Sequence, residues 1–495
     1  MKTRQSTSTL TIPSETDILL IEPPYSMEER YGKVGKTGGF VPPMGLAALA
    51  AYMIKHKYTV DVIDSPTLGY TAKDIMDLVE KYDPKCIGIS SLTPSFKNAV
   101  GMAKLLKERF PNKLIIIGGH HATILPKEVI QQNDCFDVLV YGEGELTLHE
   151  VMNVLSSVKY NPKKFLSNYA RLRKINGIVY RQGKSTIMTN RRELITDVDE
   201  LPLPARHLLP MDRYIPLPNQ YKRRPSVVML VIRGCPYQCA FCSANIVFGR
   251  MIRPRSPKNA VDEIKHVMKE YGAKEISFWD DMLTSNKVWL REFCNRIIDE
   301  KLDILWTCYA RADSVDLETL SLMKKAGCWN IFFGFEAGDQ TLLNNIDKRI
   351  TLEQIRNVVK WCKKVGIEIR ASFMLALPGE TPKLALKTIK FAISLNAEYT
   401  QFSITTPFPG TRLFDIADQY GRLDKDFSQY NDLKPVFVPH GYKDEEEIKK
   451  MARLAMRMYY YRPRYVLDKL RRIESFEDVR RNLKGIRFLF GLFND

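Results

Sequence analysis

Short apolar runs alternate with helical patterns over about the first 160 residues, and this alternation constrains the fold more than any other feature. The predicted strands are residues 17–22, 59–64, 86–90, 114–118 and 138–141. The predicted helices are residues 45–55, 75–81 and 96–110, with another from about residue 145. Strands separated by helices form a parallel, doubly wound, Rossmann-like α/β sheet. Ligands of such a sheet bind at the carboxyl ends of its strands.

The loops after these strands are rich in glycine and in hydroxyl side chains. They are Glu-Pro-Pro-Tyr at 22–25, Ser-Ser-Leu-Thr-Pro at 90–94, Gly-Gly-His-His-Ala-Thr at 118–123 and Tyr-Gly-Glu-Gly-Glu at 141–145. Glycine lets the backbone approach a ligand closely, and hydroxyls supply hydrogen bonds. No GxGxxG motif follows the first strand, so a dinucleotide is not favoured.

A second series of β/α units begins near residue 225. Its predicted strands are residues 227–232, 275–279, 304–308, 331–335, 368–376 and 400–405, with helical patterns between them, for example at 261–271 and 352–365. Six such units predict a partial TIM barrel, a (β/α)6 fold whose site lies at the C-terminal ends of the strands. Polar residues and glycines gather at these ends, where each one alone would read as an ordinary loop residue.

Cys235, Cys239 and Cys242 follow the first strand of this series directly. Thiolates are the usual ligands of iron–sulfur clusters, and three of them leave one iron of a [4Fe-4S] cluster open, as in a catalytic site. The alternatives are a zinc site or three unrelated loop cysteines, but a structural zinc site usually has a second closely spaced pair. The remaining cysteines lie singly in apolar segments and are predicted core residues: Cys86, Cys135, Cys294, Cys308, Cys328 and Cys362.

The cysteine spacing, with Phe241 before the last cysteine, resembles the signature of the radical S-adenosylmethionine (SAM) superfamily. The resemblance implies a [4Fe-4S] cluster that chelates SAM through its open iron and cleaves it to a 5′-deoxyadenosyl radical. The fourth strand ends in Gly-Phe-Glu-Ala-Gly at 334–338 rather than the commoner Gly-Ile-Glu-Ser-Gly, a conservative departure. The residues implied to contact SAM are Phe241, Asp280, Asp281, Arg311, Gly334, Glu336 and Gly379.

The first domain resembles the cobalamin (B12)-binding domain that precedes the radical SAM core in one branch of the superfamily. The matching pieces are Pro-Pro-Met-Gly at 42–45 and the loops at 118–123 and 141–145. The DxHxxG motif is absent, so cobalt would lack that histidine ligand. His120 and His121 could neighbour the corrin; a plain loop histidine is the alternative for each, and it is favoured for His120. The residues implied to bind cobalamin are Pro43, Gly45, Ser90, Ser91, Thr93, Gly118, Gly119, His121, Thr123, Gly142 and Glu143.

These patterns divide the chain into five parts. They are a disordered start at 1–15, a cobalamin-binding domain at 16–160, a hairpin and proline-rich linker at 161–224, a radical SAM barrel at 225–415 and a basic helical region at 416–495. The last part carries helical patterns at 445–461 and 464–472, a Tyr-x-Arg-Pro-x-Tyr motif and an apolar end at 486–493. We expect these helices to cap the barrel edge, because apolar helical faces are usually core; the alternative is contact with an anionic membrane surface.

Composition limits the cellular setting. The chain has 495 residues and a net charge of +17, which fits nucleic acid, an anionic membrane surface or anionic small molecules. No apolar run reaches the roughly 18 residues that span a bilayer, and the polar N-terminus has no secretory signal. Unpaired cysteine spacing favours a reducing compartment, so we expect a cytoplasmic protein, or one peripheral to the inner face of the membrane.

The resemblance therefore implies a cobalamin-dependent radical SAM enzyme that methylates an unactivated carbon, with methylcobalamin as the methyl donor. The alternative is an anaerobic oxidative cyclase of a porphyrin-like or lipid substrate. A methylthiotransferase is disfavoured, because no further three-cysteine group lies in the N-terminal half. An RNA-modifying factor lacks a binding module, and a non-catalytic sensor is the least favoured class. The expected partners are a small-molecule or lipid substrate and a one-electron reductant of flavodoxin or ferredoxin type.

Overall fold

A computed structural model describes residues 16–26, 29, 39–430 and 434–471. The predicted disordered start at 1–15 and the apolar end at 486–493 lie outside these residues. The chain divides into two compact units. The first contains Gly45–Arg192 with Met1–Pro24 and Pro202–Pro210, and the second contains Met211–Asp495 with Tyr25–Met44 and Glu193–Leu201.

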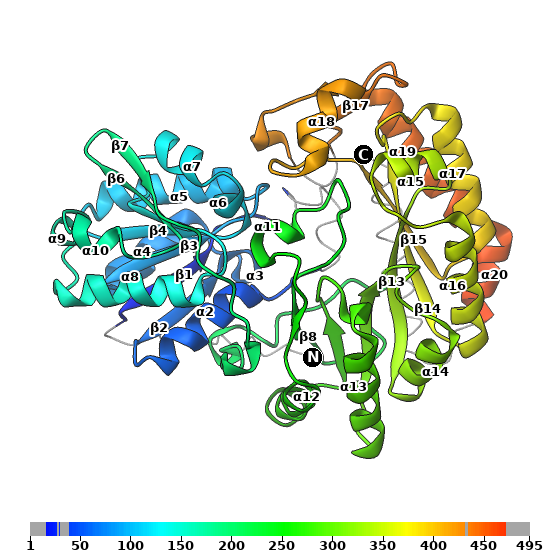
Figure 1. The fold of residues 1–495 in the computed structure, drawn as a ribbon, viewed down its shortest axis with the longest axis horizontal. Coiled ribbons are helices and arrows are strands. Elements are labelled where there is room, and N and C mark those ends of the chain that lie inside the picture. Colours follow the sequence, from blue (N-terminus) through cyan, green and yellow to red (C-terminus); the bar gives the residue numbers. More distant parts are fainter. Residues whose placement is uncertain (1–15, 27–28, 30–38, 431–433, 472–495) are drawn as a thin grey trace, which may run out of the picture. The chain divides into compact units, whose positions relative to one another are not determined.

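The first unit is built on a seven-stranded sheet of order β2-β1-β3-β4-β5-β6-β7 (Figure 1). Strands β1 to β5 run parallel, and the predicted hairpin adds β6, antiparallel to β5, and then β7, antiparallel to β6, at one edge. The strands are β1 Ile18–Glu22, β2 Val60–Asp64, β3 Cys86–Ser90, β4 Leu114–Gly118, β5 Val138–Val140, β6 Ile178–Gln182 and β7 Ser185–Met188. The doubly wound sheet predicted from the alternating pattern is confirmed.

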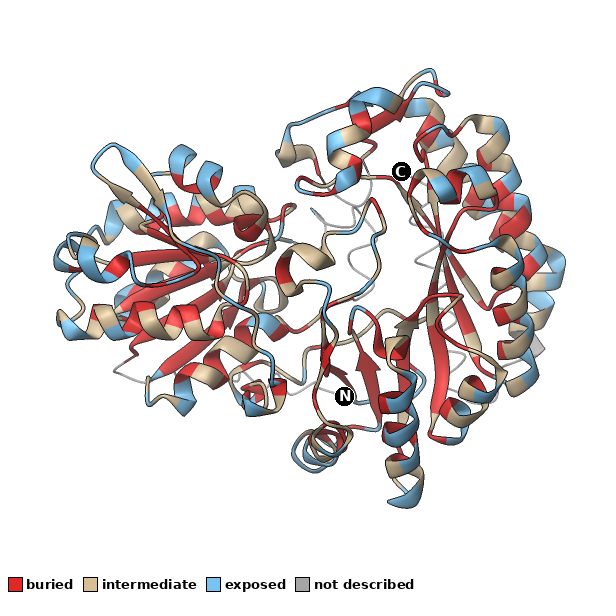
Figure 2. Ribbon diagram, in the orientation of Figure 1, coloured by how far each residue is buried: buried red, intermediate tan, exposed pale blue. Residues whose placement is uncertain are grey.

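Helices cover both faces of this sheet, because its parallel strands are apolar on both sides. Ile21, Ile87 and Ile117 are fully buried in the core beneath them, and Figure 2 shows the strands as buried. The helices are α2 Met44–Lys55, α3 Ser65–Leu68, α4 Ala72–Tyr82, α5 Phe96–Arg109, α6 His120–Ile124, α7 Pro126–Gln132, α8 Glu145–Ser157, α9 Pro162–Leu166 and α10 Tyr169–Leu172.

The second unit contains a six-stranded parallel sheet of order β15-β14-β13-β12-β11-β8, with helices along its outer face (Figure 1). The strands are β8 Ser226–Met229, β11 Glu275–Phe278, β12 Leu305–Ala310, β13 Cys328–Glu336, β14 Glu368–Leu375 and β15 Tyr399–Ile404. The helices are α11 Ala244–Phe248, α12 Pro257–Tyr271, α13 Lys287–Asp299, α14 Leu317–Lys325, α15 Gln340–Asn345, α16 Leu352–Val365, α17 Pro382–Leu395 and α18 Arg412–Tyr420. This is the predicted partial barrel.

The first predicted strand of the barrel, at 227–232, is interrupted. Strand β8 ends at Met229, and a short strand β9, Ile232–Arg233, pairs antiparallel with β10, Arg253–Pro254. Asp280 causes the break, because its Oδ1 accepts hydrogen bonds from the backbone N–H groups of Val231 and Ile232. The chain therefore leaves the sheet just before the three cysteines.

The C-terminal helices α19, Glu445–Tyr460, and α20, Pro463–Arg471, follow a small antiparallel pair of strands, β16 Gly421–Leu423 and β17 Phe437–Pro439. Strand β15 is an edge strand whose backbone groups need partners. The Tyr460 hydroxyl donates to Thr400 O at 2.6 Å and accepts from Thr400 N at 3.0 Å, and the Tyr459 hydroxyl donates to Ala397 O at 2.7 Å. For the described part of this region, the predicted cap on the barrel edge is confirmed.

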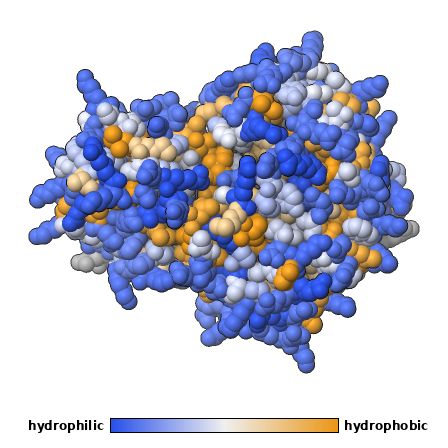
Figure 3. Space-filling model, in the orientation of Figure 1, coloured by the Kyte–Doolittle hydropathy of each residue, from blue (hydrophilic) through white to orange (hydrophobic). Residues whose placement is uncertain are grey.

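Hydrophilic side chains cover most of the face shown in Figure 3. Among the described residues, no helix is both long and apolar enough to cross a membrane.

The Tyr460 contact predicts the stability of the barrel edge. Removing the hydroxyl in Tyr460→Phe leaves both backbone groups of Thr400 without this partner, which should lower the free energy of unfolding by about 2 kcal/mol. All five tryptophans lie in the second unit, so denaturant unfolding followed by tryptophan fluorescence reports the barrel. The exposed neighbour provides the control: Tyr461→Phe should change stability by less than about 0.5 kcal/mol. Equal losses in the two variants would contradict the assigned role of Tyr460.

Candidate functional site

The loop that carries the three cysteines, residues 235–242, lies between β9 and α11 and is tied to the barrel by its backbone. Cys235 N donates to Gly249 O at 3.3 Å. Ala240 N donates to Ile346 O at 2.8 Å, and Ala240 O accepts from Leu413 N at 2.8 Å. Cys235 and Cys239 are half-buried and Cys242 is exposed, whereas the other six cysteines are buried, as predicted. The barrel therefore presents a fixed loop of accessible thiols.

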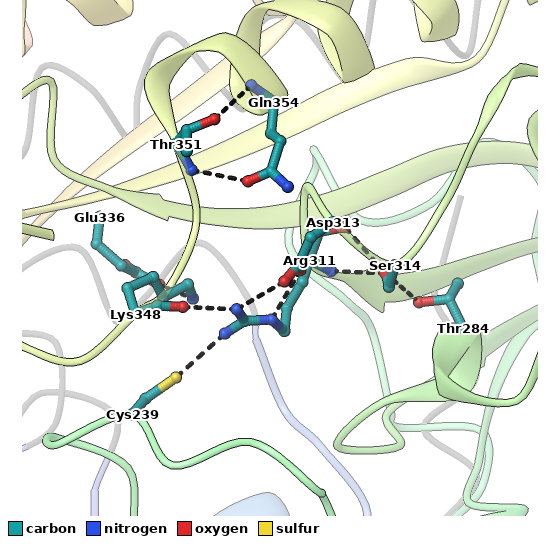
Figure 4. A network of polar contacts seen from close by, with 9 residues as sticks. All are labelled: Cys239, Thr284, Arg311, Asp313, Ser314, Glu336, Lys348, Thr351 and Gln354. Carbon is teal, nitrogen blue, oxygen red and sulfur yellow. Dashed lines mark hydrogen bonds and ion pairs between the residues drawn. The ribbon is translucent and has the colours of Figure 1, made fainter. Parts of the chain in front are cut away.

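The Arg311 guanidinium, at the end of β12, holds this loop from the side (Figure 4). Its Nη1 donates to Cys239 Sγ at 3.3 Å, and its Cζ lies 3.8 Å from the centre of the Tyr237 ring. Asp313 accepts from Nε at 2.9 Å and from Nη2 at 3.0 Å. Nη2 also donates to Lys348 O at 2.5 Å. Within the described residues, one N–H of Arg311 is left for a ligand, so its main contacts are with the cysteine loop and its supports.

A buried ion pair lies beside the loop. Lys348 Nζ donates to Glu336 Oε1 at 2.6 Å, and both side chains are 7% exposed. Lys348 also lies 5.7 Å from the centre of the Phe241 ring. The Glu336 carboxylate folds back onto the backbone at Gly334, where an added Cβ would overlap it. Glycine at 334 therefore leaves room for the ion pair, a reason that the sequence motif alone did not supply.

The two aspartates after β11 differ in their surroundings. Asp280 is 2% exposed, its Oδ1 is held by the backbone as described above, and its Oδ2 has no hydrogen-bond partner among the described residues. Burial raises the pKa of Asp280 to about 8. Asp281 is exposed, and its charge contributes to raising the pKa of Cys235 and Cys242. Asp280 therefore shapes the start of the cysteine loop, whereas Asp281 lies near the thiols.

The charges around the loop fit an iron–sulfur cluster. Burial, followed by the neighbouring thiols and Asp281, raises the pKa of Cys235 to about 11, so the thiol alone stays protonated at neutral pH. Bound iron releases such protons, and the nearby Arg311 and Lys348 offset the anionic thiolates that result. Among the described residues, no three His, Cys, Asp or Glu side chains, the three cysteines included, lie close enough together to hold a single metal ion.

The loop after β14 carries Gly379 and a buried carboxyl group. Gly379 is exposed in a turn whose Pro378 O accepts from Asn345 Nδ2 at 2.8 Å. Glu380 is fully buried, and its Oε1 accepts from Ala376 N at 2.7 Å and from the Tyr442 hydroxyl at 2.6 Å. Burial raises the pKa of Glu380 to about 7. Glu380 thus holds the turn that positions Gly379.

In the first unit, the loops after β3, β4 and β5 are joined by hydrogen bonds. Ser91 N donates to Gly118 O at 3.1 Å, and the Thr123 hydroxyl donates to Gly119 O at 2.9 Å while accepting from Gly142 N at 3.1 Å. Gly119 has φ +92°, and an added Cβ would lie 2.7 Å from Ser91 O and 2.8 Å from Ser90 Oγ. The structure therefore brings these predicted residues together at the carboxyl ends of the strands.

His121 and Ser91 show which groups could face a ligand. His121 is 2% exposed, its Nδ1 lies 3.1 Å from Thr93 Oγ1, and its ring packs 4.1 Å from that of Phe96. Burial lowers the pKa of His121 to about 4, so its ring is neutral. Ser91 Oγ is buried with no hydrogen-bond partner among the described residues, a donor that a polar ligand would satisfy. The glycine cradle and this hydroxyl fit a large ligand with polar edges.

The remaining predicted residues stand somewhat apart. Pro43 immediately precedes α2, Gly45 is exposed in the first turn of that helix, and an added Cβ at Gly45 would meet no atom within 4 Å. Glu143 is buried in the loop after β5.

Comparison with known proteins identifies the family. Residues 32–152 match the B12 binding domain family, and residues 229–392 match the radical SAM superfamily. The uncharacterized methyltransferase PH0819 of Pyrococcus horikoshii is 34% identical over 470 residues, 95% of this chain and 97% of the relative. This chain belongs to the cobalamin-dependent radical SAM family. Its cofactors are cobalamin, SAM and a [4Fe-4S] cluster.

Other relatives of this radical SAM enzyme have been assigned different reactions or solved as structures. The anaerobic magnesium-protoporphyrin IX monomethyl ester cyclase of Rubrivivax gelatinosus is 28% identical, covering 85% of this chain and 73% of the cyclase. The cobalamin-dependent SAM radical enzyme OxsB, with aqua-cobalamin and SAM bound, shares the fold with a TM-score of 0.70 at 15% identity, covering 97% of this chain and 72% of OxsB. The methyltransferase TsrM of Kitasatospora setae shares it with a TM-score of 0.63 at 17% identity, covering 82% of this chain and 75% of TsrM.

Sequence reasoning missed several residues of the radical SAM site. Tyr237 lies inside the cysteine motif, where an aromatic residue could have been noticed. Lys348 and Tyr442 gave no signal, since they follow helix α15 and strand β17 in unremarkable polar segments and meet Glu336 and Glu380 only through the fold.

The pKa of Glu380 predicts a pH effect. A carboxyl group that keeps its proton in the folded enzyme but loses it near pH 4.5 when unfolded makes the enzyme less stable as the pH rises from about 4.5 through 7. Glu380→Gln cannot ionise, so the wild type should lose stability relative to this variant by about 1 kcal/mol per pH unit between pH 5 and 7. Denaturant unfolding at several pH values measures the difference. A wild type that gains stability relative to the variant would show that Glu380 is ionised in the fold.

The cradle at Gly119 predicts a matched pair of variants. Gly119→Ala and Gly69→Ala both place alanine at positive φ, +92° and +71°, but only the first adds a clash with a neighbouring loop. We expect Gly119→Ala to retain less than about a tenth of the cobalamin that the wild type retains after gel filtration, and Gly69→Ala to retain most of it, because Gly69 lies in the same unit outside the assigned cobalamin residues. Cobalamin absorbance per chain measures retention. Equal retention would remove Gly119 from the cobalamin site.

Proposed function

We propose that this enzyme methylates an unactivated carbon atom of a small-molecule substrate. The contact between Arg311 and Cys239 carries the proposal, because it fixes an accessible thiol loop beside a permanent positive charge at the barrel mouth. A nearly full-length relative at 34% identity bears the name methyltransferase, which supports methyl transfer over other reactions of the family. When bound, the cluster supplies an electron for SAM cleavage and cobalamin supplies the methyl group.

The residues divide between holding cofactors and positioning them. We assign the cluster to Cys235, Cys239 and Cys242, and SAM to Phe241, Asp281, Gly334 and Gly379. Asp280, Arg311 and Glu336 act mainly through the loop and the ion pair, because their side chains are engaged there. The hydrogen bond from Arg311 to Cys239 withdraws charge from the sulfur, which eases reduction of a cluster.

We assign cobalamin to the joined loops of the first unit. Ser90, Ser91 and Gly119 form the cradle, and Thr93, His121 and Thr123 hold its backbone in place. Because His121 is neutral and packed against Phe96, it orders the loop rather than charging it. The assignment extends to Gly45, Gly118, Gly142 and Glu143 of this unit, and to Pro43, which directly precedes helix α2.

An oxidative cyclase is the second candidate, supported by the relative in Rubrivivax gelatinosus at 28% identity. Both reactions would use the same cluster loop, so the candidates differ in whether a methyl group leaves SAM. In either case a one-electron reductant of flavodoxin or ferredoxin type must reach the cluster, which favours a reducing, cytoplasmic location.

The cluster assignment predicts the outcome of a cysteine exchange. Cys239→Ala should abolish the formation of 5′-deoxyadenosine from SAM in the anaerobically reconstituted, reduced enzyme and should lower its iron content. The bound cobalamin should stay, because Cys239 lies in the other unit. Cys294→Ala, which changes a buried core cysteine of α13, is the control and should keep both. Unchanged 5′-deoxyadenosine formation in Cys239→Ala would remove the cysteine loop from the reaction.

A further inference from the structure

The barrel sheet has a packed face and an open face. Side chains alternate between the two faces along each strand. Ile331, Phe333 and Ile369 point outward and are fully buried beneath the helices. Their neighbours on the inner face are half-buried or exposed: Leu230, Trp279, Tyr309, Phe332, Ser372 and Gln401. The inner face is therefore accessible at residues that no assignment above uses.

Three aromatic rings form a continuous wall on this inner face. Tyr309 belongs to β12, Phe332 belongs to β13, and Trp279 directly follows β11. The Trp279 and Tyr309 ring centres are 6.3 Å apart at right-angled geometry, and those of Tyr309 and Phe332 are 5.1 Å apart. Trp279 Nε1 is satisfied by Ser277 Oγ at 2.8 Å. Successive rings are inclined at 79° and 56°, so they offer ring faces and edges against which an aromatic ligand can stack.

Arg370, on the neighbouring strand β14, closes the end of this wall. It pairs in register with Phe332, and its Cζ lies 5.3 Å from the Phe332 ring centre and 6.0 Å from that of Tyr309. The residue is 4% exposed. Among the described residues, its one hydrogen bond runs from Nε to Asn330 Oδ1 at 2.7 Å, which leaves both Nη nitrogens without a hydrogen-bond partner.

No carboxylate among the described residues forms an ion pair with Arg370. Glu275 influences its charge, but less than Tyr309 and Cys308 do, and backbone N–H groups of Lys222 and Arg223, each at 2.7 Å, already donate to one oxygen of the Glu275 carboxylate. Burying a cation beside only neutral partners is costly, and such groups are usually paired. The buried cation beside an aromatic wall therefore lacks the anion that would complete the site.

We propose that Arg370 and the wall of Trp279, Tyr309 and Phe332 bind the substrate, which is a flat, conjugated molecule carrying a carboxylate or phosphate group. The inference rests on the proposed function, because it names the substrate class for the same barrel. Gly334, assigned to SAM, lies two residues along β13 from Phe332, the register partner of Arg370. A strand rises about 3.3 Å per residue, so the anionic group of the substrate binds about 7 Å deeper in the barrel than SAM. The other end of the substrate then lies near SAM.

Calorimetric titration of the full-length chain with 2-naphthoate, 2-naphthamide and 1-naphthyl phosphate tests the site. The wild type should bind one of the two anions at least tenfold more tightly than the neutral amide, and the preferred anion identifies carboxylate or phosphate. Arg370→Met should lose this preference. Arg356→Met is the matched control, because Arg356 stacks 5.1 Å from Phe391 on the outer, exposed side, and it should keep the preference.

Stability separates binding from a structural role. Arg370→Met removes a buried cation without an acidic partner, so the variant should unfold at the same or a higher denaturant concentration than the wild type. Equal binding of anion and amide by the wild type, or an anion preference that survives in Arg370→Met, would overturn the proposal. The titration uses neither SAM nor reductant. Its outcome is therefore independent of catalysis. If methyl transfer from SAM failed while anion binding held, the proposed function would be contradicted and this site would stand.

Discussion

The guanidinium of Arg311 is the contact on which the cysteine loop depends most. It joins Cys239 and the Tyr237 ring of the cysteine loop to the Asp313 carboxylate after β12 and the Lys348 carbonyl after α15, so three parts of the barrel meet at one side chain. Arginine suits this position because its planar fork donates in several directions, stacks on rings and stays charged. Ala240 is buried in this loop and Phe241 packs partly against the core, and the polar contacts of Arg311 position the thiols between and beside them.

Two buried carboxyl groups likewise position loops at the strand ends through hydrogen bonds to the backbone. Asp280 draws Val231 and Ile232 out of the sheet, and Glu380 holds the turn at Ala376, a non-glycine residue with φ +60°. Burial raises the pKa of both acids, so each is kept in a state that water would not favour. Strained backbone and costly burial of this kind persist where a site requires them, and the packed helices outside the sheet supply the compensating stability.

The sequence predicted the features that depend on a few neighbouring residues. Alternating apolar runs located both sheets, and cysteine spacing located the loop, because these signals span a few residues. The rest depends on contacts between distant residues, such as Arg311 with Cys239, 72 positions apart, or Lys348 with Glu336 across a helix. A sequence motif also does not show where a side chain points. The motif around His121 resembles a cobalamin-binding loop, and in the structure the His121 ring packs against Phe96. The buried cation Arg370 looks from the sequence like any strand residue, and only strand register places it beside an aromatic wall.

The fate of the methyl group of SAM tests the account most directly. The enzyme loaded with cobalamin and cluster, reduced, and given methyl-labelled SAM and the acidic fraction of a small-molecule extract can be followed by mass spectrometry. The account predicts a product heavier by one labelled methyl group, with S-adenosylhomocysteine and 5′-deoxyadenosine formed in comparable amounts. An oxidised product without the label, accompanied by 5′-deoxyadenosine but no S-adenosylhomocysteine, would contradict it.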